Sequence, residues 1–411
     1  MTESAASGKD RVRKRPLRSF QKILLLLAGL AIALLLAEVG LRIVGFSHFN
    51  PYIADRELGA ALRPNAEGWW RREGDNYVTI NSQGLRDREH AIAKPQDVIR
   101  IAVLGDSFAE AFQVPMEQTF WTVMEQKLSP CAASTGRTIE VLNFGVSGFS
   151  TARELVMLRQ RVWQYSPDIV LLLVTTRNDV RDNSPALNRY GNSPLPYFVN
   201  REGSLKLDDS RLQTRNDSVF FRLRQSFVGR SFDWLRTHSR VMGLLDAARD
   251  AYLWRREQAG KDGDGAEVGL DDEVFSPPSS SDWRGAWDLT ERLITQMRDE
   301  VEAKGAKFLV VTGSSSIQVN PDTELRNEYM KRLKVDTLFY PDLRIKGLGE
   351  SSRFEVLTLA PFLLDYATRN QVLLHGSKET TGKGHWNQTG HRLVGELIAE
   401  KLCEPGWLKG P

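Results

Sequence analysis

The chain has 411 residues, of which 41% are hydrophobic and 26% are charged, and its formal net charge at pH 7 is +3. These values are ordinary for a globular protein, and the length allows one large domain with insertions or two domains. Its two cysteines, Cys131 and Cys403, exclude a cysteine-rich metal module and a disulfide-dense scaffold. They leave open either one long-range disulfide or two free thiols. The net charge indicates no particular partner, and no nucleic acid, metal or cofactor is expected.

The first part of the chain resembles a membrane anchor. Residues 1–22 are polar and basic, whereas residues 23–37 carry no charge and apolar character continues to Phe46. As a helix, residues 23–46 would span about 36 Å, enough for a bilayer core. The basic flank predicts a cytoplasmic tail of residues 1–22, with the rest of the chain outside, in the periplasm of a Gram-negative cell. A cleaved signal peptide has the same order, but no clean small-x-small site follows, which favours an uncleaved single-pass anchor of the inner membrane.

Residues 47–97 form an N-terminal extension with one short predicted strand, 77–80, and a turn after it. Strands and helices then alternate, which is typical of a three-layer α/β fold around a parallel five-stranded sheet. Nearly continuous apolar runs predict strands that are buried on both faces. The predicted strands are 98–104, 139–143, 169–174, 308–312 and 354–359, and the predicted helices are 117–128, 152–164, 288–303 and 391–402.

Residues 183–283 interrupt this alternation, and we interpret them as an insertion between 98–182 and 284–411 that partly covers the site as a lid. Residues 183–217 are turn-rich, 219–256 are basic and aromatic with helical spacing, and 258–281 read as a flexible loop. A basic face on the helical part suits an anionic polymer or lipid headgroups, although such a face is more often only solvated. Its members are Arg222, Arg224, Arg230, Arg236 and Arg240.

Three strand ends and one histidine carry groups that fit a single chemistry. Gly105-Asp-Ser107 follows the first strand, Gly145-Val-Ser-Gly148 the second and Thr175-Thr-Arg-Asn178 the third. Because the carboxyl ends of parallel strands meet at one edge of a sheet, these groups are expected to converge. Ser107 offers a nucleophilic hydroxyl, while Gly148 and Asn178 offer N–H donors for an oxyanion. His385 precedes the last helix and is the expected base. Ser147 is expected to be a turn hydroxyl, and His391 is expected to be a surface or packing residue.

These blocks, in this order, resemble the SGNH (GDSL-type) hydrolase superfamily, with a flank similar to its membrane-anchored bacterial branch. The resemblance covers roughly residues 77–182 and 284–403. It implies a flavodoxin-like SGNH fold in which Ser107 is the nucleophile and His385 the base. Asp106 would mainly shape the turn. The N–H groups of Ser107 and Gly148 and the side chain of Asn178 would form the oxyanion hole. The absence of Gly-x-Ser-x-Gly argues against the α/β-hydrolase fold.

Two positions depart from the family pattern. The family usually carries an Asp three residues before the histidine, where this chain has Gly382. Three alternatives follow: a Ser107–His385 dyad, a substitute acid of which Glu379 is the nearest upstream, or weakened activity. The second departure is Arg177, where the family usually has Gly, and its charge at the pocket mouth would favour acidic or polar substrates.

The leading hypothesis is a membrane-anchored, extracytoplasmic serine esterase that removes an acyl group, acetyl above all, from a saccharide or a lipid-linked substrate. A polysaccharide O-acyltransferase would use the same acyl-enzyme with a sugar hydroxyl as acceptor. A glycan-binding envelope protein with an impaired site is the alternative from a different class. The sequence leaves the oligomeric state open.

Overall fold

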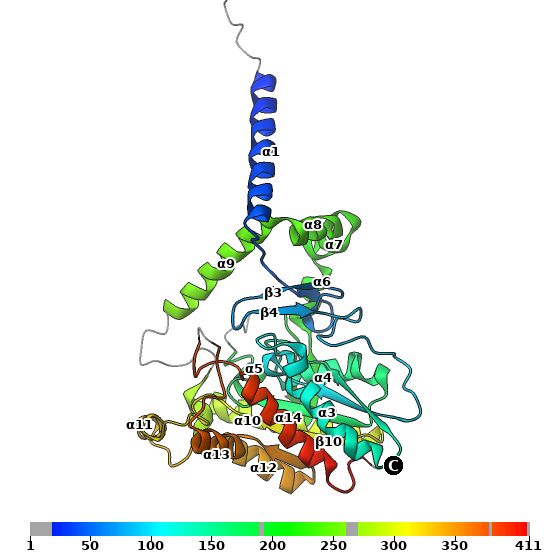
Figure 1. The fold of residues 1–411 in the computed structure, drawn as a ribbon, viewed down its shortest axis with the longest axis vertical. Helices are drawn as coiled ribbons and strands as arrows, with labels where there is room; N and C mark the ends of the chain where they lie inside the picture. The colour runs from blue at the N-terminus through cyan, green and yellow to red at the C-terminus, as the bar shows by residue number, and fades with distance from the viewer. Residues whose placement is uncertain (1–18, 189–192, 260–269, 378–379, 409–411) are drawn as a thin grey trace, which may run out of the picture.

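A parallel sheet forms the centre of the computed structural model, which describes residues 19–188, 193–259, 270–377 and 380–408. It has five strands in the order β11-β10-β7-β5-β6 (Figure 1). When the five strands are numbered along the chain and taken from β6 to β11, their order is 2-1-3-4-5, the flavodoxin-like arrangement. The α/β fold expected from the sequence is therefore confirmed. The strands are β5 (Val98–Leu104), β6 (Thr138–Asn143), β7 (Ile169–Thr175), β10 (Lys307–Gly313) and β11 (Glu355–Thr358).

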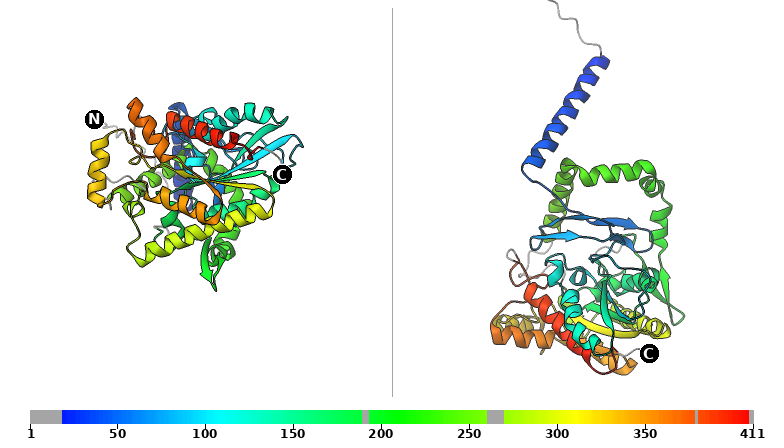
Figure 2. Two further views of the ribbon diagram at one scale, coloured as in Figure 1. Left: turned by 90° about the horizontal axis from the view of Figure 1, so that it is seen from below. Right: turned by 45° about the vertical axis from the view of Figure 1, so that its right-hand side comes forward.

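Helices cover both faces of the sheet (Figure 2). Because side chains alternate along a strand, Ile101 and Val103 of β5 join one apolar core, whereas Ala102 and Leu104 join the other. The first core contains residues of α3 (Phe120–Ala133), α13 (Ala360–Asn370) and α14 (Gln388–Cys403). The second contains residues of α4 (Thr151–Gln160), α10 (Ser281–Ala303) and α12 (Tyr340–Ser352). Shorter elements complete this part: α2 (Ser107–Glu110), η1 (Met116–Gln118), η2 (Val162–Tyr165), α5 (Asp179–Asn183), η3 (Asp272–Phe275) and α11 (Thr323–Leu333).

One expectation about this region was wrong, and two helices were missed. The strand β11 is not buried on both faces, because it forms one edge of the sheet and its residues are exposed or half-buried. The helices α12 and α13 were not among the predicted helices, and each contains a proline, Pro341 and Pro361. Each proline lies in the first turn of its helix, where a missing N–H costs nothing.

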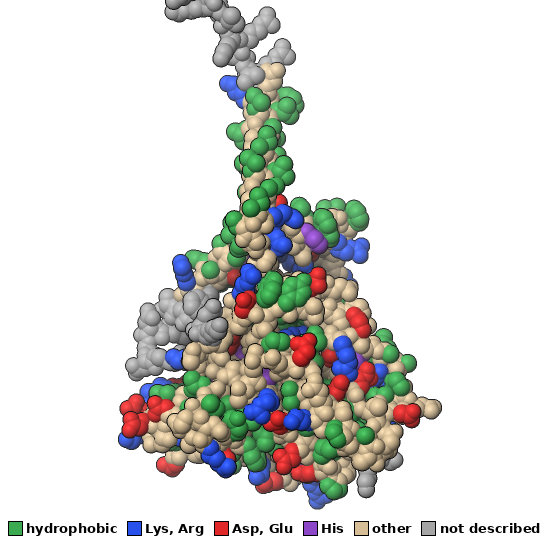
Figure 3. All heavy atoms as spheres, in the orientation of Figure 1, with side chains coloured by type: hydrophobic (Ala, Val, Ile, Leu, Met, Phe, Trp, Pro, Cys, Tyr) green, Lys and Arg blue, Asp and Glu red, His purple; other side chains and the backbone are tan. Residues whose placement is uncertain are grey.

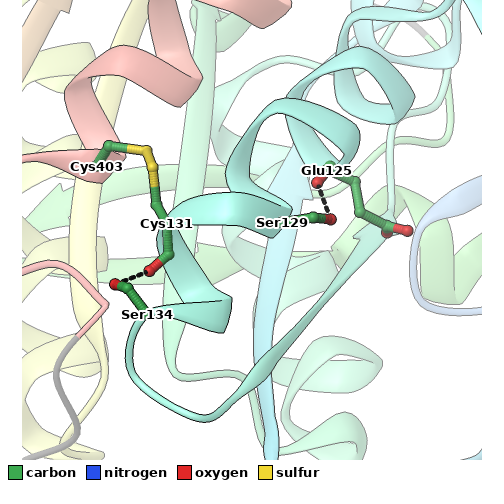
Figure 4. Close-up of a disulfide and its surroundings, with 5 residues drawn as sticks. All are labelled: Glu125, Ser129, Cys131, Ser134 and Cys403. Carbon is green, nitrogen blue, oxygen red and sulfur yellow. Dashed lines mark hydrogen bonds between the residues drawn. A yellow bond between two sulfur atoms is a disulfide. The ribbon is translucent and has the colours of Figure 1, made fainter.

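A disulfide between Cys131 and Cys403 joins the last turn of α3 to the end of α14 (Figure 4). The two Cα atoms are 5.8 Å apart, an ordinary separation for a disulfide. The alternative of two free thiols is thereby resolved in favour of the bridge.

The N-terminal part extends away from the sheet. The helix α1 (Ser19–Ile43) stands out from the domain and has no buried residue (Figure 1). By length and composition it is able to cross a membrane, with a mean hydropathy of 2.6 over its most apolar window. Glu38 and Arg42 of this helix pair at 2.9 Å, as their spacing suggested. Two antiparallel hairpins follow: β1 (Tyr52–Asp55) with β2 (Gly59–Leu62), and β3 (Glu67–Trp70) with β4 (Asn76–Thr79).

The segment between α5 and α10 contains more regular structure than the sequence suggested. Its turn-rich first part forms the hairpin β8 (Tyr197–Arg201) and β9 (Ser204–Asp208), followed by α6 (Ser210–Asp217). The helical part becomes α7 (Val219–Gln225), α8 (Phe227–His238) and α9 (Arg240–Ala259). Residues 260–269 of the expected flexible loop lie outside the described residues. The rest of that loop is ordered, because Val274 and Phe275 are buried in η3.

Candidate active site

Ser107 is the first residue of α2 and follows the end of β5. Asp106 shapes this turn, since one carboxylate oxygen accepts hydrogen bonds from the Phe108 N–H at 3.0 Å and from the Thr175 hydroxyl at 2.9 Å. The Asp106 side chain is completely buried. These bonds tie the turn after β5 to the end of the neighbouring strand β7, which fixes the serine at the carboxyl edge of the sheet.

His385 lies in the loop between α13 and α14, at the same edge as Ser107. Its Nε2 is 2.7 Å from the Ser107 hydroxyl oxygen, although the two residues are 278 positions apart. The Phe108 ring packs against the imidazole with a centroid distance of 4.8 Å. The next residue, Trp386, is fully buried and anchors the loop in the core. The imidazole is therefore held within hydrogen-bonding distance of the hydroxyl.

A carboxylate meets the other side of the ring, and it belongs to Glu73. The His385 Nδ1 is 2.5 Å from Glu73 Oε2, and the backbone N–H of His385 donates to Glu73 Oε1 at 2.8 Å. Gly384 permits this approach because a Cβ atom at that position would lie 2.5 Å from the carboxylate. Its φ of +86° also suits glycine. Serine, histidine and carboxylate thus form one continuous chain of contacts.

The hairpin of β3 and β4 positions Glu73, which lies in the turn between the two strands. Trp70 at the end of β3 packs its ring against Phe112, with centroids 5.1 Å apart. On the other side of the turn, the Asn76 amide donates to the carbonyl of Gln113. Both partners belong to the loop that follows α2, so the turn carrying Glu73 is held against the segment next to Ser107.

Glu73 takes the place beside His385 that the family usually fills with an Asp at the position of Gly382. Gly382 adopts a φ of +76° and offers no side chain to the imidazole. Glu379, the nearest upstream acid, lies outside the described residues. Sequence reasoning missed Glu73 because it is 312 positions from His385 and lies in a separate hairpin. The one local signal, Gly384 directly before the histidine, indicates a close approach without identifying the group that approaches.

The two charges shift each other's pKa. Burial disfavours the charged imidazole, but the charge and hydrogen bond of Glu73 outweigh burial and raise the pKa of His385 above its usual value. Burial would likewise raise the pKa of Glu73, yet the His385 charge and hydrogen bonds, with a contribution from Arg177, lower it. Glu73 is therefore ionised at neutral pH and stabilises an imidazolium.

Gly148 and Asn178 lie in the segments that follow the two strands beside β5. Gly148 has a φ of +72° and open space where a Cβ would stand, so the backbone there is accessible. The Asn178 amide nitrogen is 3.3 Å from Asp106 Oδ2, which orients the side chain beside the serine turn. Their roles in an oxyanion hole remain predictions.

Three residues near the site, Ser147, His391 and Arg177, are held by contacts with other parts of the protein. Ser147 contacts the buried Glu110, donating its N–H at 3.1 Å, and burial raises the pKa of that carboxyl to about 7. His391 is buried and stacks on Phe120 with centroids 6.1 Å apart. Arg177 is 7% exposed rather than open at a pocket mouth, and its guanidinium lies 6.0 Å from the centre of the Phe108 ring.

Within the described ranges, no group of three or more His, Cys, Asp or Glu side chains is arranged to hold a metal.

Comparisons with known proteins give one sequence match and several weak structural similarities. No family model matches the chain. An arylesterase of Vibrio mimicus is 29% identical over 105 residues, which are 26% of this chain and 50% of that protein. The chain thus spans about half the length of the curated relative it matches.

Two solved structures illustrate the structural similarities. A catalytic mutant of an acetylxylan esterase from Geobacillus stearothermophilus is 10% identical, covers 76% of this chain and 97% of its own, and has a TM-score of 0.37. A protein assigned to the G-D-S-L lipolytic family from Desulfitobacterium hafniense is 11% identical, covers 73% and 98%, and has a TM-score of 0.34. With its 2-1-3-4-5 parallel sheet and its four motif blocks after the strands and before α14, the chain itself resembles the SGNH (GDSL-type) hydrolases in fold and in motif order.

Proposed function

We propose that the chain is a serine esterase in which Ser107, His385 and Glu73 act as nucleophile, base and acid. One observation carries this proposal, namely the continuous contact from the Ser107 hydroxyl through both nitrogens of His385 to the Glu73 carboxylate. This arrangement supplies the base that a weakly acidic hydroxyl needs and the charge that an imidazolium needs. It favours catalysis over glycan binding at an impaired site.

In the first step, the Ser107 oxygen attacks the ester carbonyl carbon while its proton passes to His385 Nε2. The resulting oxyanion receives hydrogen bonds from the N–H groups of Ser107 and Gly148 and from the Asn178 amide. His385 then returns the proton to the departing alcohol oxygen, which leaves an acyl group on Ser107. A water molecule attacks that acyl group, gives its proton to His385 and releases the acid, and His385 reprotonates Ser107.

We assign the reaction to a short acyl ester, acetyl above all, on a saccharide or lipid-linked alcohol outside the cytoplasm. The helix α1 serves as an uncleaved anchor in this proposal, with residues 1–22 in the cytoplasm. The disulfide supports the location, because disulfides persist in oxidising compartments.

The test is hydrolysis of acetyl aryl esters and acetylated saccharides by the full chain in detergent, together with labelling by a fluorophosphonate. Ser107→Ala and His385→Ala should each abolish turnover, and Ser107→Ala should abolish labelling. Ser351→Ala, an exposed serine on α12, is the matched control and should leave both unchanged. Unchanged turnover or labelling in Ser107→Ala would refute the proposal. Free acetate as the product would indicate hydrolysis, whereas an acetylated saccharide would indicate transfer of the acyl group to a sugar hydroxyl.

A reporter fusion tests the topology. A reporter that is active only outside the cytoplasm, fused after Gly45, should be active, because α1 ends at Ile43. Activity of a strictly cytoplasmic reporter at the same junction would contradict the proposed orientation. A mature protein that begins after α1 would show instead that the segment is a cleaved signal peptide.

A further inference from the structure

The helix α8 turns its apolar face to the surface. Five large apolar side chains share one side of this helix and are 52–79% exposed, and no residue of α8 is buried. They are Phe227, Val228, Phe232, Trp234 and Leu235, called here the apolar face of α8. A surface helix of a globular domain ordinarily directs such a face into the core. An exposed apolar patch of this kind marks a binding surface.

The polar face of α8 contacts the rest of the protein instead. Arg236 forms an ion pair with Asp246 of α9, with its Nε 2.9 Å from the carboxylate. Asp233 accepts from Arg224 of α7 at 3.3 Å, and Thr237 bonds to Arg63 of the extension. These bonds fix the rotation of the helix about its axis, so the apolar face points outward because the polar face is already engaged.

The start of α9 and the end of α8 are fastened to α1. The Glu38 carboxylate accepts hydrogen bonds from the N–H groups of Arg240 at 2.9 Å and Val241 at 3.0 Å, and thereby caps α9. Arg42 donates to the carbonyl of His238, the last residue of α8, at 3.0 Å. The insertion is thus attached at the end of α1 that is nearest to the domain.

The level of this attachment matches a membrane boundary. From Ser19 to Glu38 a helix rises about 29 Å at roughly 1.5 Å per residue, close to the thickness of a hydrocarbon core. Figures 1 and 2 show α8 beside the domain end of α1, running across its direction. Figure 3 shows hydrophobic side chains gathered there, next to the base of α1. The neighbouring α7 adds Val219, Phe220 and Leu223, which are 58–75% exposed.

We propose that α7 and α8 lie on the lipid surface of the membrane that α1 crosses, with the apolar face of α8 inserted at the headgroup boundary. This inference rests on the anchor assigned to α1 under the proposed function. Amphipathic helices of this kind bury aromatic and aliphatic side chains in the interface and use basic residues for anionic headgroups. Arg222 and Arg230 are exposed on α7 and α8 and serve the second role. The contact would hold the domain at a fixed height and tilt over the bilayer.

The test uses the full chain in vesicles of phosphatidylcholine and phosphatidylglycerol, with and without brominated acyl chains. A single cysteine at Ser231→Cys, exposed among the apolar residues of α8, carries an environment-sensitive fluorophore. The two native cysteines are already paired, so the new thiol is labelled selectively. Labels at Leu30→Cys in α1 and at Ser351→Cys in α12 are the matched controls, and hydrolysis of an acetyl aryl ester shows that each variant is folded.

Bromolipid should quench the labels at 231 and 30 but not the label at 351. An unquenched label at 231 beside a quenched label at 30 would overturn the surface contact and leave the anchor intact. Unquenched labels at both positions would overturn the anchor and the surface contact together, while hydrolysis still reports on the proposed activity. A label at 231 that becomes shielded only at high protein density, without quenching, would identify a second copy as the occupant and would also overturn the proposal.

Discussion

Among the residues that the structure describes, two serine–histidine pairs lie at the carboxyl edge of the sheet. The Ser107 hydroxyl follows β5 and lies 2.7 Å from His385 Nε2, while the Ser314 hydroxyl follows β10 and lies 3.1 Å from His375 Nε2. The partners on the far side of the two rings differ. His385 Nδ1 meets the Glu73 carboxylate, whereas His375 Nδ1 donates to the backbone carbonyl of Gly384 at 2.8 Å.

Access to solvent also differs. Ser314 and His375 are 1% and 2% exposed, and the Ser314 oxygen accepts a hydrogen bond from the Trp386 indole at 3.0 Å. The His385 side chain is 27% exposed. The buried pair therefore holds residues 384 and 386 on either side of His385, and no substrate reaches it. A hydroxyl beside an imidazole becomes a candidate nucleophile only when a substrate can approach it.

The largest expected effect comes from removing the negative charge beside His385 Nδ1. Glu73→Gln replaces the charge on Nδ1 with a neutral amide, so the imidazolium formed during attack loses its stabilisation. Loss of this role in a serine triad lowers kcat by about 10⁴-fold. The measurement is kcat for an acetyl aryl ester, with Glu67→Gln in the same hairpin as control. A Glu73→Gln rate within threefold of the parent, on the order of 0.6 kcal/mol, would show that the site works as a Ser107–His385 dyad.

A second change tests the donors that surround Ser107. Asn178→Ala removes an amide expected to bind the oxyanion, and loss of one such donor costs about 10²–10³-fold in kcat. Because the donor acts on the transition state, KM should change little. Asn370→Ala, on an exposed turn at the end of α13, is the control. An increase in KM with an unchanged kcat would place Asn178 in ground-state binding instead.

Ser314→Ala should affect stability more than catalysis. It leaves the Trp386 indole N–H and a His375 nitrogen without their partner in a buried region, at a cost of about 1–3 kcal/mol in the free energy of unfolding. Denaturant unfolding gives this difference, and kcat should stay within about tenfold (roughly 1.4 kcal/mol) of the parent. A stable variant that has lost turnover would show that Ser314 takes part in the chemistry.

The smallest effect is a displacement of the pH profile. The base must be neutral to accept the Ser107 proton, so kcat/KM should fall as the pH drops through the pKa of His385. Glu73 raises that pKa, and in Glu73→Gln burial is no longer outweighed, so the acidic limb should move to lower pH. The measurement is the residual activity of Glu73→Gln from pH 5 to 9. An acidic limb that stays in place or moves upward would contradict this assignment of charge.

Most of the sheet and three of its strand ends could be predicted from the sequence because their signals are local. The run from Val98 to Leu104 is apolar without interruption, and Gly105-Asp-Ser107 follows it directly. Glu73 could not be predicted, since no local pattern links a hairpin turn to a histidine 312 positions away. The same limit applies to α8, where helical spacing indicates that an apolar face exists but not which way it points. That direction depends on the ion pairs of Arg236 and Asp233 with other helices.

The disulfide divides the proposed catalytic residues between a covalent loop and the tail that precedes it. Cys131 and Cys403 are 272 positions apart, so their bond closes a covalent loop that contains His385. Glu73 and Ser107 lie on the tail that precedes the loop. A protease cut anywhere within the loop leaves a single covalent molecule, in which the fragment with His385 stays tethered beside Ser107. A protein nicked between Cys131 and His385 would therefore remain one covalent molecule in an oxidising compartment, and a reductant would remove the covalent link between Ser107 and His385.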